Sequence, residues 1–258
     1  MSEYVLYSVE NGIGQLSVNR PEVMNALNNE VTNAIGALLD DAAADKNLKV
    51  LIVGSKDNFG AGADVDEFVD YTPEQVRQSP LMFACNKLEL LPVPTIAAVE
   101  GYALGGALEL ALACDFRIAG AGAQMGFPEI NLGLFPGAGG TVRLSRLIGP
   151  SRAKDMIFMG KNVDAEAALA LGLVNSVAPA GEAGEKAKEM AVRLARKSAP
   201  GLAAAKQALA AAAAIPDMLP AVAETTRIFS TLMGTPDQQE GMRAFMEKRR
   251  PDFRGQRL

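Results

Sequence analysis

The chain has 258 residues, of which 49% are hydrophobic and 21% are charged. This composition is typical of a globular protein with a packed core and excludes a disordered chain. The formal net charge of −5 gives no electrostatic footprint for nucleic acid. The absence of histidine excludes Ser-His-Asp triads, the common histidine metal sites and a histidine general base, so no metal site is expected.

The cysteines and the N-terminus indicate a reducing, cytoplasmic setting. Cys85 and Cys114 stand in apolar surroundings without CxxC spacing, so we expect reduced core residues. The start, MSEYVLYSVE, lacks the pattern of a signal or transit peptide. The alanine-rich stretch 202–215 contains Lys206 and Gln207 in a helical pattern, so no membrane span is expected.

The first elements in chain order are two strands at 4–9 and 13–18, joined by the hairpin signal Asn11-Gly12. Asn28 is placed to cap a helix that runs to about residue 44. The apolar run at 49–54 is typical of a buried strand. An irregular glycine-rich segment follows, and then a helical region that is interrupted at Pro80 and ends near residue 91.

The same order of elements then recurs. The pattern predicts a strand at 95–99, a glycine-rich turn at 101–106, a helix at 107–113 and a strand at 115–119. Next come the loop-rich stretch GFPEINLGLFPGAGG and a helix from about residue 141. Strand, turn and helix in alternation imply right-handed βαβ units and an α/β fold.

Beyond residue 149 the chain is predicted to be mostly helical. The expected helices lie near 151–159, 164–170, 182–197, 201–214, 218–233 and 236–248, and only 173–177 resembles a strand. A composition shift near residue 200 suggests a core at 1–200 and a helical C-terminal region at 201–258. The basic run Lys248, Arg249 and Arg250 is interpreted first as a solvated helix end.

Two glycine-rich turns, GAGAD at 60–64 and GYALGG at 101–106, each follow an apolar strand. Glycine lets a ligand approach the backbone closely, and two N–H groups aimed at one carbonyl oxygen form an oxyanion hole. A turn that merely reverses the chain would look the same. Neither turn has the spacing of a phosphate-binding loop.

Two glutamates are candidates for acid/base chemistry. Glu109 lies inside the apolar segment ALELALA, where a carboxylate needs either an ion pair, with Arg117 or Arg143, or a raised pKa. Glu129 lies beside a third glycine-rich turn, PGAGG at 136–140, where it is either an exposed helix-start residue or an acid/base group. The residue pattern alone leaves these alternatives open.

These segments resemble the crotonase superfamily, which is also called the enoyl-CoA hydratase/isomerase family. The resemblance covers nearly the whole chain and lies in five motifs in the family's order: NRPEVMNALN at 19–28, FGAGADVDEF at 59–68, GYALGGALELALACDFRIA at 101–119, FPEINLGLFPGAGGTVRLSRLIG at 127–149 and EGMRAFMEKRRPDFRGQ at 240–256. It implies a crotonase-like spiral of βαβ units that forms two sheets. It also implies a helical C-terminal arm that makes trimers or dimers of trimers, which gives 201–258 the role of a trimerisation region.

The resemblance also assigns roles in binding an acyl-CoA thioester, in which coenzyme A enters as part of the substrate and no separate cofactor is expected. The N–H groups of Ala63 and Gly106 match the oxyanion donors. Gly137 matches a position that holds the water or Glu129. The matching CoA contacts are Ala61, Ala63, Asp64, Val65, Asp66, Gly106, Phe245 and Lys248, which gives Lys248 a phosphate partner in place of solvent.

Activities within the family differ, so the acid/base residues decide between them. Both Glu109 and Glu129 are present, and this pattern resembles the hydratases, which convert 2-trans-enoyl-CoA reversibly to 3-hydroxyacyl-CoA; many isomerases keep only the second glutamate. Ala107-Leu108 stands where hydratases often have Gly-Cys. The alternatives are a double-bond isomerase of the same fold and a non-catalytic CoA- or RNA-binding relative. The acyl group and the pathway, whether fatty-acid β-oxidation or another, are open.

Overall fold

The computed structural model describes residues 3–253, and its first elements are those expected. Strands β1 (Val5–Glu10) and β2 (Ile13–Val18) form a hairpin. Its turn residues Asn11 and Gly12 both have positive φ, as a two-residue hairpin turn requires. Helix α1 (Asn29–Ala44) starts at Asn28, whose side chain accepts a hydrogen bond from the N–H of Val31, so the predicted cap is confirmed.

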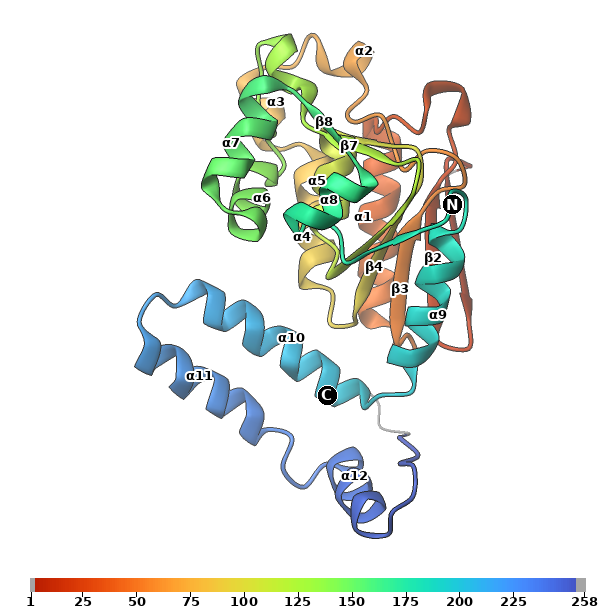
Figure 1. Ribbon diagram of the computed structural model, residues 1–258, viewed down its shortest axis with the longest axis vertical. Helices are drawn as coiled ribbons and strands as arrows, with labels where there is room; N and C mark the ends of the chain where they lie inside the picture. The colour runs from red at the N-terminus through yellow and green to blue at the C-terminus, as the bar shows by residue number, and fades with distance from the viewer. Residues whose placement is uncertain (1–2, 254–258) are drawn as a thin grey trace.

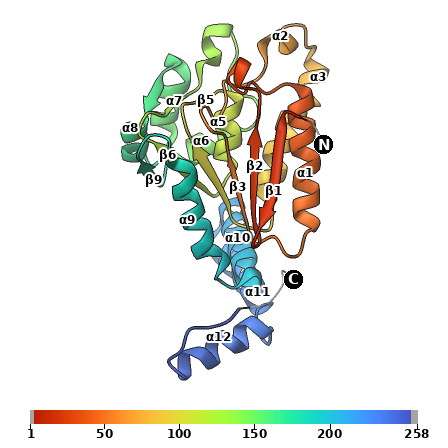
Figure 2. The ribbon, with the colours of Figure 1, turned by 90° about the vertical axis from the view of Figure 1, so that its right-hand side faces the viewer.

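The larger sheet has six strands in the order β1-β2-β3-β4-β6-β9. All its pairings except the β1–β2 hairpin are parallel, as crossover units require. The added strands are β3 (Val50–Gly54), β4 (Thr95–Val99), β6 (Phe116–Gly120) and β9 (Ser176–Ala178). Apolar side chains on the two faces of the sheet form two separate core clusters. Helix α9 (Ala183–Ala195) covers one face and α1 lies on the other (Figure 2).

A smaller sheet, with the order β5-β7-β8, is the second sheet that the family resemblance implies, although its strands were not predicted from the residue pattern. Its strands β5 (Tyr102–Leu104), β7 (Gln124–Gly126) and β8 (Asn162–Asp164) have three residues each. The stretch predicted only as a glycine-rich turn therefore contains β5. Because β4 is followed by β5 and β6 by β7, successive turns of the chain add one strand to each sheet, which makes the spiral.

The helices around the spiral lie where the sequence predicts helical regions, but some predicted regions are divided into several helices. The region between β3 and β4 is three helices, α2 (Val65–Phe68), α3 (Pro73–Arg77) and α4 (Pro80–Leu90). The short α5 (Gly106–Leu112) lies between β5 and β6. The others are the 3-10 helices η1 (Pro21–Val23) and η2 (Pro128–Leu132), and α6 (Gly140–Ile148), α7 (Pro150–Met159) and α8 (Ala165–Leu171).

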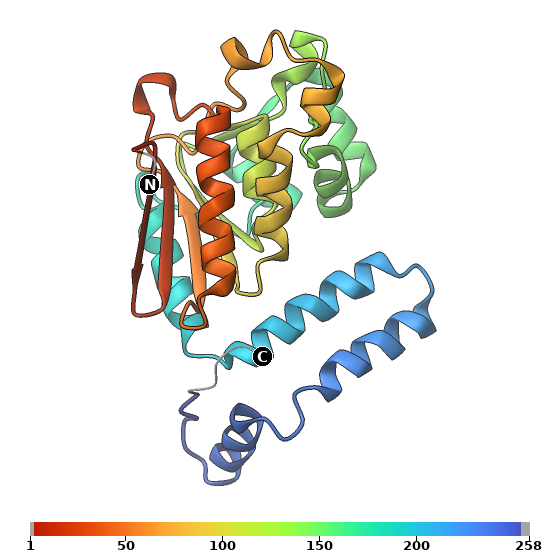
Figure 3. The same cartoon turned by 180° about the vertical axis from the view of Figure 1, so that it is seen from behind.

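The C-terminal helices stand apart from the spiral as an arm (Figures 1 and 3). Helices α10 (Ala199–Ala214) and α11 (Met218–Ser230) pack on each other, and α12 (Pro236–Met246) follows. The arm exposes several large apolar side chains, among them Leu209, Met218 and Leu219. Residues 254–256 of the C-terminal motif lie outside the described residues.

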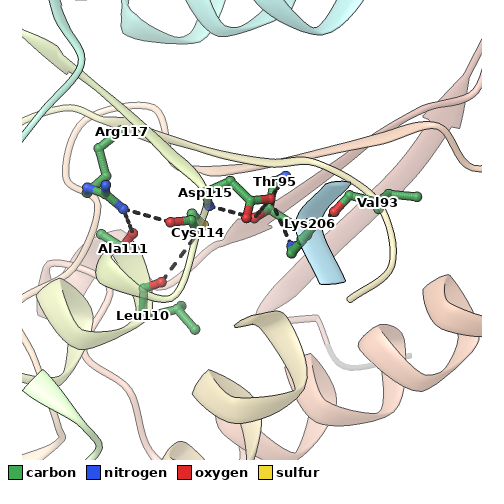
Figure 4. Close-up of polar contacts among 8 residues, drawn as sticks. All are labelled: Val93, Thr95, Leu110, Ala111, Cys114, Asp115, Arg117 and Lys206. Atoms are coloured by element: carbon green, nitrogen blue, oxygen red, sulfur yellow. Dashed lines mark hydrogen bonds and ion pairs between the residues drawn. The ribbon is translucent and has the colours of Figure 1, made fainter. Parts of the chain in front are cut away.

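One ion pair joins α10 to the start of the core strands (Figure 4). The Nζ of Lys206 lies 2.8 Å from Oδ2 of Asp115 and 3.2 Å from the carbonyl oxygen of Val93. The same carboxylate oxygen accepts hydrogen bonds from the N–H and the hydroxyl of Thr95. Asp115 is thereby fixed to the sheet, and Lys206 fixes the arm to Asp115.

Candidate active site

Glu109 lies in α5, all seven residues of which are buried, and its own exposure is 3%. Its Oε1 accepts a 2.7 Å hydrogen bond from the backbone N–H of Gly140. Neither arginine considered as an ion-pair partner fills that role. Arg117 donates to backbone carbonyls (Figure 4), and Arg143 pairs with Glu89.

The environment of Glu109 has two opposing effects on its charge. Burial raises its pKa, because the charged form loses its hydration. Hydrogen bonds from the N–H groups of Gly140 and Ala138 act in the other direction and favour the ionised form. Glu109 is therefore a buried carboxylate held in place by backbone donors, as a general base needs to be.

Glu129 lies in η2, directly after the buried strand β7 and Phe127. A Cβ on Gly105 would lie 3.0 Å from Oε1 of Glu129, so the carboxylate rests against that glycine. Its Oε2 is buried and has no hydrogen-bond partner among the described residues. Burial, and in addition the negative charge of Glu109, raise the pKa of Glu129 to about 7. The charge of Glu109 therefore acts on Glu129, although burial is the larger cause of the shift.

The first glycine turn presents the N–H of Ala63. Leu27 donates a hydrogen bond of 2.8 Å to the carbonyl of Gly62 and accepts one of 3.0 Å from the N–H of Asp64. In a planar trans peptide the C=O and the N–H point in opposite directions. The bond from Leu27 to Gly62 therefore aims the N–H of Ala63 away from Leu27 and toward the second glycine turn.

The second glycine turn presents the N–H of Gly106. Gly105 has φ +50°, which favours glycine, and its carbonyl accepts the first hydrogen bond of α5 from Glu109. A Cβ on Gly106 would lie 3.5 Å from the nitrogen of Ala63, so the two donors are neighbours. Within residues 3–253, neither N–H donates to a protein acceptor. Two neighbouring, unused backbone donors are groups from which an oxyanion hole can be built.

Most of the other residues predicted to bind CoA or water lie on the segments that flank Ala63 and Gly140. Ala61 and Asp64 flank the Ala63 segment, and Val65 and Asp66 begin α2 with exposed side chains. Gly137 is exposed in the turn before Gly140, and a Cβ on it would have no atom of Glu129 within 4 Å. The predicted roles of these residues in binding CoA or water stay predictions.

Phe245 and Lys248 are not brought to the glutamates within one chain. Phe245 lies in α12 with 85% of its surface exposed, and Lys248 follows the helix. Figures 1 and 3 place α12 at the far end of the arm from α5. Arg249 pairs with Glu240 and Glu247, so that part of the basic tail is bound within the arm.

Sequence reasoning missed three contributors to the site: Gly105, Gly140 and Leu27. The two glycines stand in turns that had been singled out, but only the packing reveals that they lie against carboxylates. Nothing in the local sequence marks Leu27 as the residue that aims the N–H of Ala63.

Two cavities lie near this part of the fold, and they differ in size. One of about 20 Å³ adjoins Ala63 and is lined by residues of α1 and α2 together with Leu81. A larger one of about 500 Å³ lies between α4, α6 and the end of α10, and neither glutamate lines it. Within the described chain, no cluster of side chains could hold a metal ion. No helix there is long and apolar enough to cross a membrane.

A spiral of βαβ units with two unused backbone donors near two buried carboxylates is the arrangement that the family resemblance implies, and comparison with known families agrees on the family. The family model described as enoyl-CoA hydratase/isomerase matches residues 8–256. The chain belongs to this family, whose fold is the crotonase fold.

Known relatives match over nearly their whole length. The chain is 40% identical to the 2,3-dehydroadipyl-CoA hydratase of Escherichia coli, over 99% of this chain and 100% of that protein. It is 38% identical to a probable enoyl-CoA hydratase of Mycobacterium bovis, over 97% of this chain and 98% of that protein. The crystal structure of an enoyl-CoA hydratase from Bacillus anthracis superposes with a TM-score of 0.93 at 35% identity, covering 98% of this chain and 100% of that one.

Proposed function

We propose that this protein adds water reversibly to the double bond of a 2-trans-enoyl-CoA and forms a 3-hydroxyacyl-CoA. The observation that carries the proposal is the pair Glu109 and Glu129, both with raised pKa, beside the unused N–H groups of Ala63 and Gly106. A double-bond isomerase needs a proton carrier but no second group to activate water. Two carboxylates therefore favour hydration.

In this mechanism the thioester oxygen binds between the N–H groups of Ala63 and Gly106. When the oxygen of water bonds to carbon 3, the π electrons move through carbon 2 onto the thioester oxygen and give an enolate. The fixed donors stabilise this charge more than that of the ground state, which lowers the barrier. Loss of one such donor typically costs ~3–4 kcal/mol of barrier.

The two glutamates move the protons. Glu109, which is held by hydrogen bonds from two backbone donors, takes a proton from the attacking water. Glu129, with a pKa of about 7, gives its proton to carbon 2 as the enolate collapses. The reaction ends with the proton on Glu109 instead of Glu129, and dehydration follows the same path in reverse.

The acyl group lies, in this proposal, beside α2 and the start of α4. Coenzyme A passes Ala61, Asp64, Val65 and Asp66 at the rim of the site.

The arm completes the assembly. Its exposed apolar side chains support a homotrimer or a dimer of trimers, with 1–200 as the spiral core and 201–258 as the trimerisation region. In such an assembly Phe245 and Lys248 reach the CoA nucleotide of a neighbouring subunit. The buried free cysteines Cys85 and Cys114 support a reducing compartment such as the cytoplasm.

The test is Glu109→Gln and Glu129→Gln, assayed with crotonyl-CoA by loss of the conjugated thioester absorbance. Each substitution keeps the shape and removes the acid/base group, so kcat should fall ~10²–10⁴-fold. Glu189→Gln, at an exposed pair with Lys186 on α9, is the matched control and should keep the wild-type rate. A folded Glu109 or Glu129 variant at wild-type rate would contradict the mechanism. Formation of a 2-enoyl-CoA from a 3-enoyl-CoA, without hydration, would favour the isomerase.

A further inference from the structure

The side chain of Arg20 lies next to the segment that carries Ala63, and the proposed reaction does not use it. Only 13% of this side chain is exposed. Its Nη1 donates to the carbonyl of Ala26 at 2.8 Å and lies 3.1 Å from Oδ2 of Asp64. Its carbon Cζ lies 5.5 Å from the centre of the Tyr4 ring. A cation is thus fixed beside the segment that carries Ala63.

The hydrogen bonds from Arg20 lead to the donor through two peptide groups. The carbonyl of Ala26 and the N–H of Leu27 belong to one peptide, and that N–H donates to the carbonyl of Gly62 at 2.8 Å. The carbonyl of Gly62 and the N–H of Ala63 belong to the next peptide. The described peptide bonds are all trans, so each group accepts on one side and donates on the other.

We propose that Arg20 is the charged end of a hydrogen-bonded relay, through the Ala26–Leu27 and Gly62–Ala63 peptides, that aims and polarises the N–H of Ala63. This inference rests on the proposed oxyanion role of Ala63. A charged donor makes a stronger hydrogen bond than a neutral one, and hydrogen bonds in a chain polarise one another by ~10–30% per bond. The positive charge of Arg20 therefore makes the N–H of Ala63 a better donor to a developing enolate oxygen.

The backbone around Arg20 holds the start of the relay in place. The N–H of Arg20 donates to Oδ1 of Asn25, and the N–H of Asn25 donates to the carbonyl of Arg20, both at 2.8 Å. The N–H of Ala61 donates to the carbonyl of Met24 and ties the same loop to the first glycine turn. Arg20 is a positioning residue, because it acts on the substrate only through Ala63.

The experiment measures the bound carbonyl directly. Butyryl-CoA carrying ¹³C at the thioester carbon has no double bond to hydrate, so it reports on binding without turnover. Isotope-edited infrared spectra are compared for wild type, Arg20→Met, Arg20→Gln and Arg20→Lys. The matched control is Arg193→Met, at an exposed arginine of α9 on the other face of the sheet.

In wild type the carbonyl stretch should fall to a lower wavenumber than in free butyryl-CoA. In Arg20→Met the carbonyl stretch should move part of the way back toward that of free butyryl-CoA. The kcat for crotonyl-CoA should fall ~10-fold with little change in KM, and this loss in kcat is smaller than the ~10²–10³-fold loss on removing a donor outright. Arg20→Gln keeps a neutral donor and Arg20→Lys keeps the charge, so both should lie between Arg20→Met and wild type. Arg193→Met should match wild type.

A merely structural role for Arg20 would lower the melting temperature and leave the carbonyl stretch of the bound ligand unchanged, which would overturn the relay. If Arg20→Met does not fold, a carbonyl stretch equal to that of wild type in both Arg20→Gln and Arg20→Lys would also overturn the relay. If wild type itself does not shift the carbonyl stretch, the oxyanion role of Ala63 fails and the relay with it. Absence of hydration with a normal shift would instead overturn only the proposed reaction.

Discussion

The backbone N–H of Gly140 donates to Oε1 of Glu109 at 2.7 Å, and the two residues are so close that no side chain fits at position 140. A Cβ there would lie 2.9 Å from both Cγ and Oε1 of Glu109 and 2.8 Å from Cβ of Pro136. Gly140 therefore sets the position of the buried carboxylate.

Gly140→Ala should lower kcat for hydration of crotonyl-CoA ~10- to 100-fold, because a misplacement of about 1 Å can cost ~10²-fold. Steady-state kinetics on the folded variant measure the loss. Gly122→Ala is the control, since a Cβ at Gly122 has nothing within 4 Å. A wild-type kcat for Gly140→Ala would mean that Glu109 does not need this position to act.

The pH dependence should follow the glutamate pair. Hydration needs a proton on Glu129, whose pKa is about 7, so kcat/KM should fall as the pH rises above about 7. Dehydration needs the single proton of the pair on Glu109, with Glu129 ionised. Both directions therefore use the singly protonated pair, and kcat/KM for dehydration should have the same pH profile. Profiles measured in both directions test this, and a kcat/KM that stays constant from pH 6 to 9 would contradict a shared proton.

The same carboxyl links stability to pH. The folded-state pKa of Glu129 is raised from 4.5 to about 7, so folding favours its protonated form. This contribution to stability is fully present below pH 4.5 and is lost as the pH rises through about 7. The melting temperature of Glu129→Gln minus that of wild type should therefore increase as the pH rises over this window. An equal difference at pH 5 and pH 8 would show that the carboxyl is not perturbed.

The arm should loosen when its ion pair is removed. Lys206→Ala leaves Asp115 without its cation at a site where both side chains are largely buried, so unfolding should become easier by about 1–2 kcal/mol. Lys161→Ala removes an exposed ion pair with Asp155 and should change stability by less than about 1 kcal/mol. Denaturant titration measures both, and limited proteolysis should cut the arm of Lys206→Ala faster. Equal stability of the two variants would show that the pair does not hold the arm.

The cysteines should be inert in the folded protein. Burial raises the pKa of Cys114 to about 12 and also raises that of Cys85, so neither forms a thiolate near neutral pH. An aromatic disulfide reagent at pH 8 should label two thiols in denaturant and none in the native state. Rapid labelling without denaturant would contradict this burial.

Much of the fold could be predicted because local patterns report burial along one element. The β1–β2 hairpin, the Asn28 cap and the buried strands β3 and β4 follow from apolar runs and turn residues. The strands β5, β7 and β8 could not be predicted in this way, because three residues are too few for a periodic pattern to form. They exist because successive turns of the spiral bring them side by side.

By itself, the sequence determined that Glu109 is buried, that glycine-rich turns follow two strands, and that the motifs are those of the enoyl-CoA hydratase/isomerase family. Only the tertiary structure decided that Glu109 rests on Gly140, 31 residues away, and that Arg20 meets Asp64, 44 residues away. The physical reason is that a residue's burial depends on its own segment's pattern, whereas its partner depends on how distant segments pack.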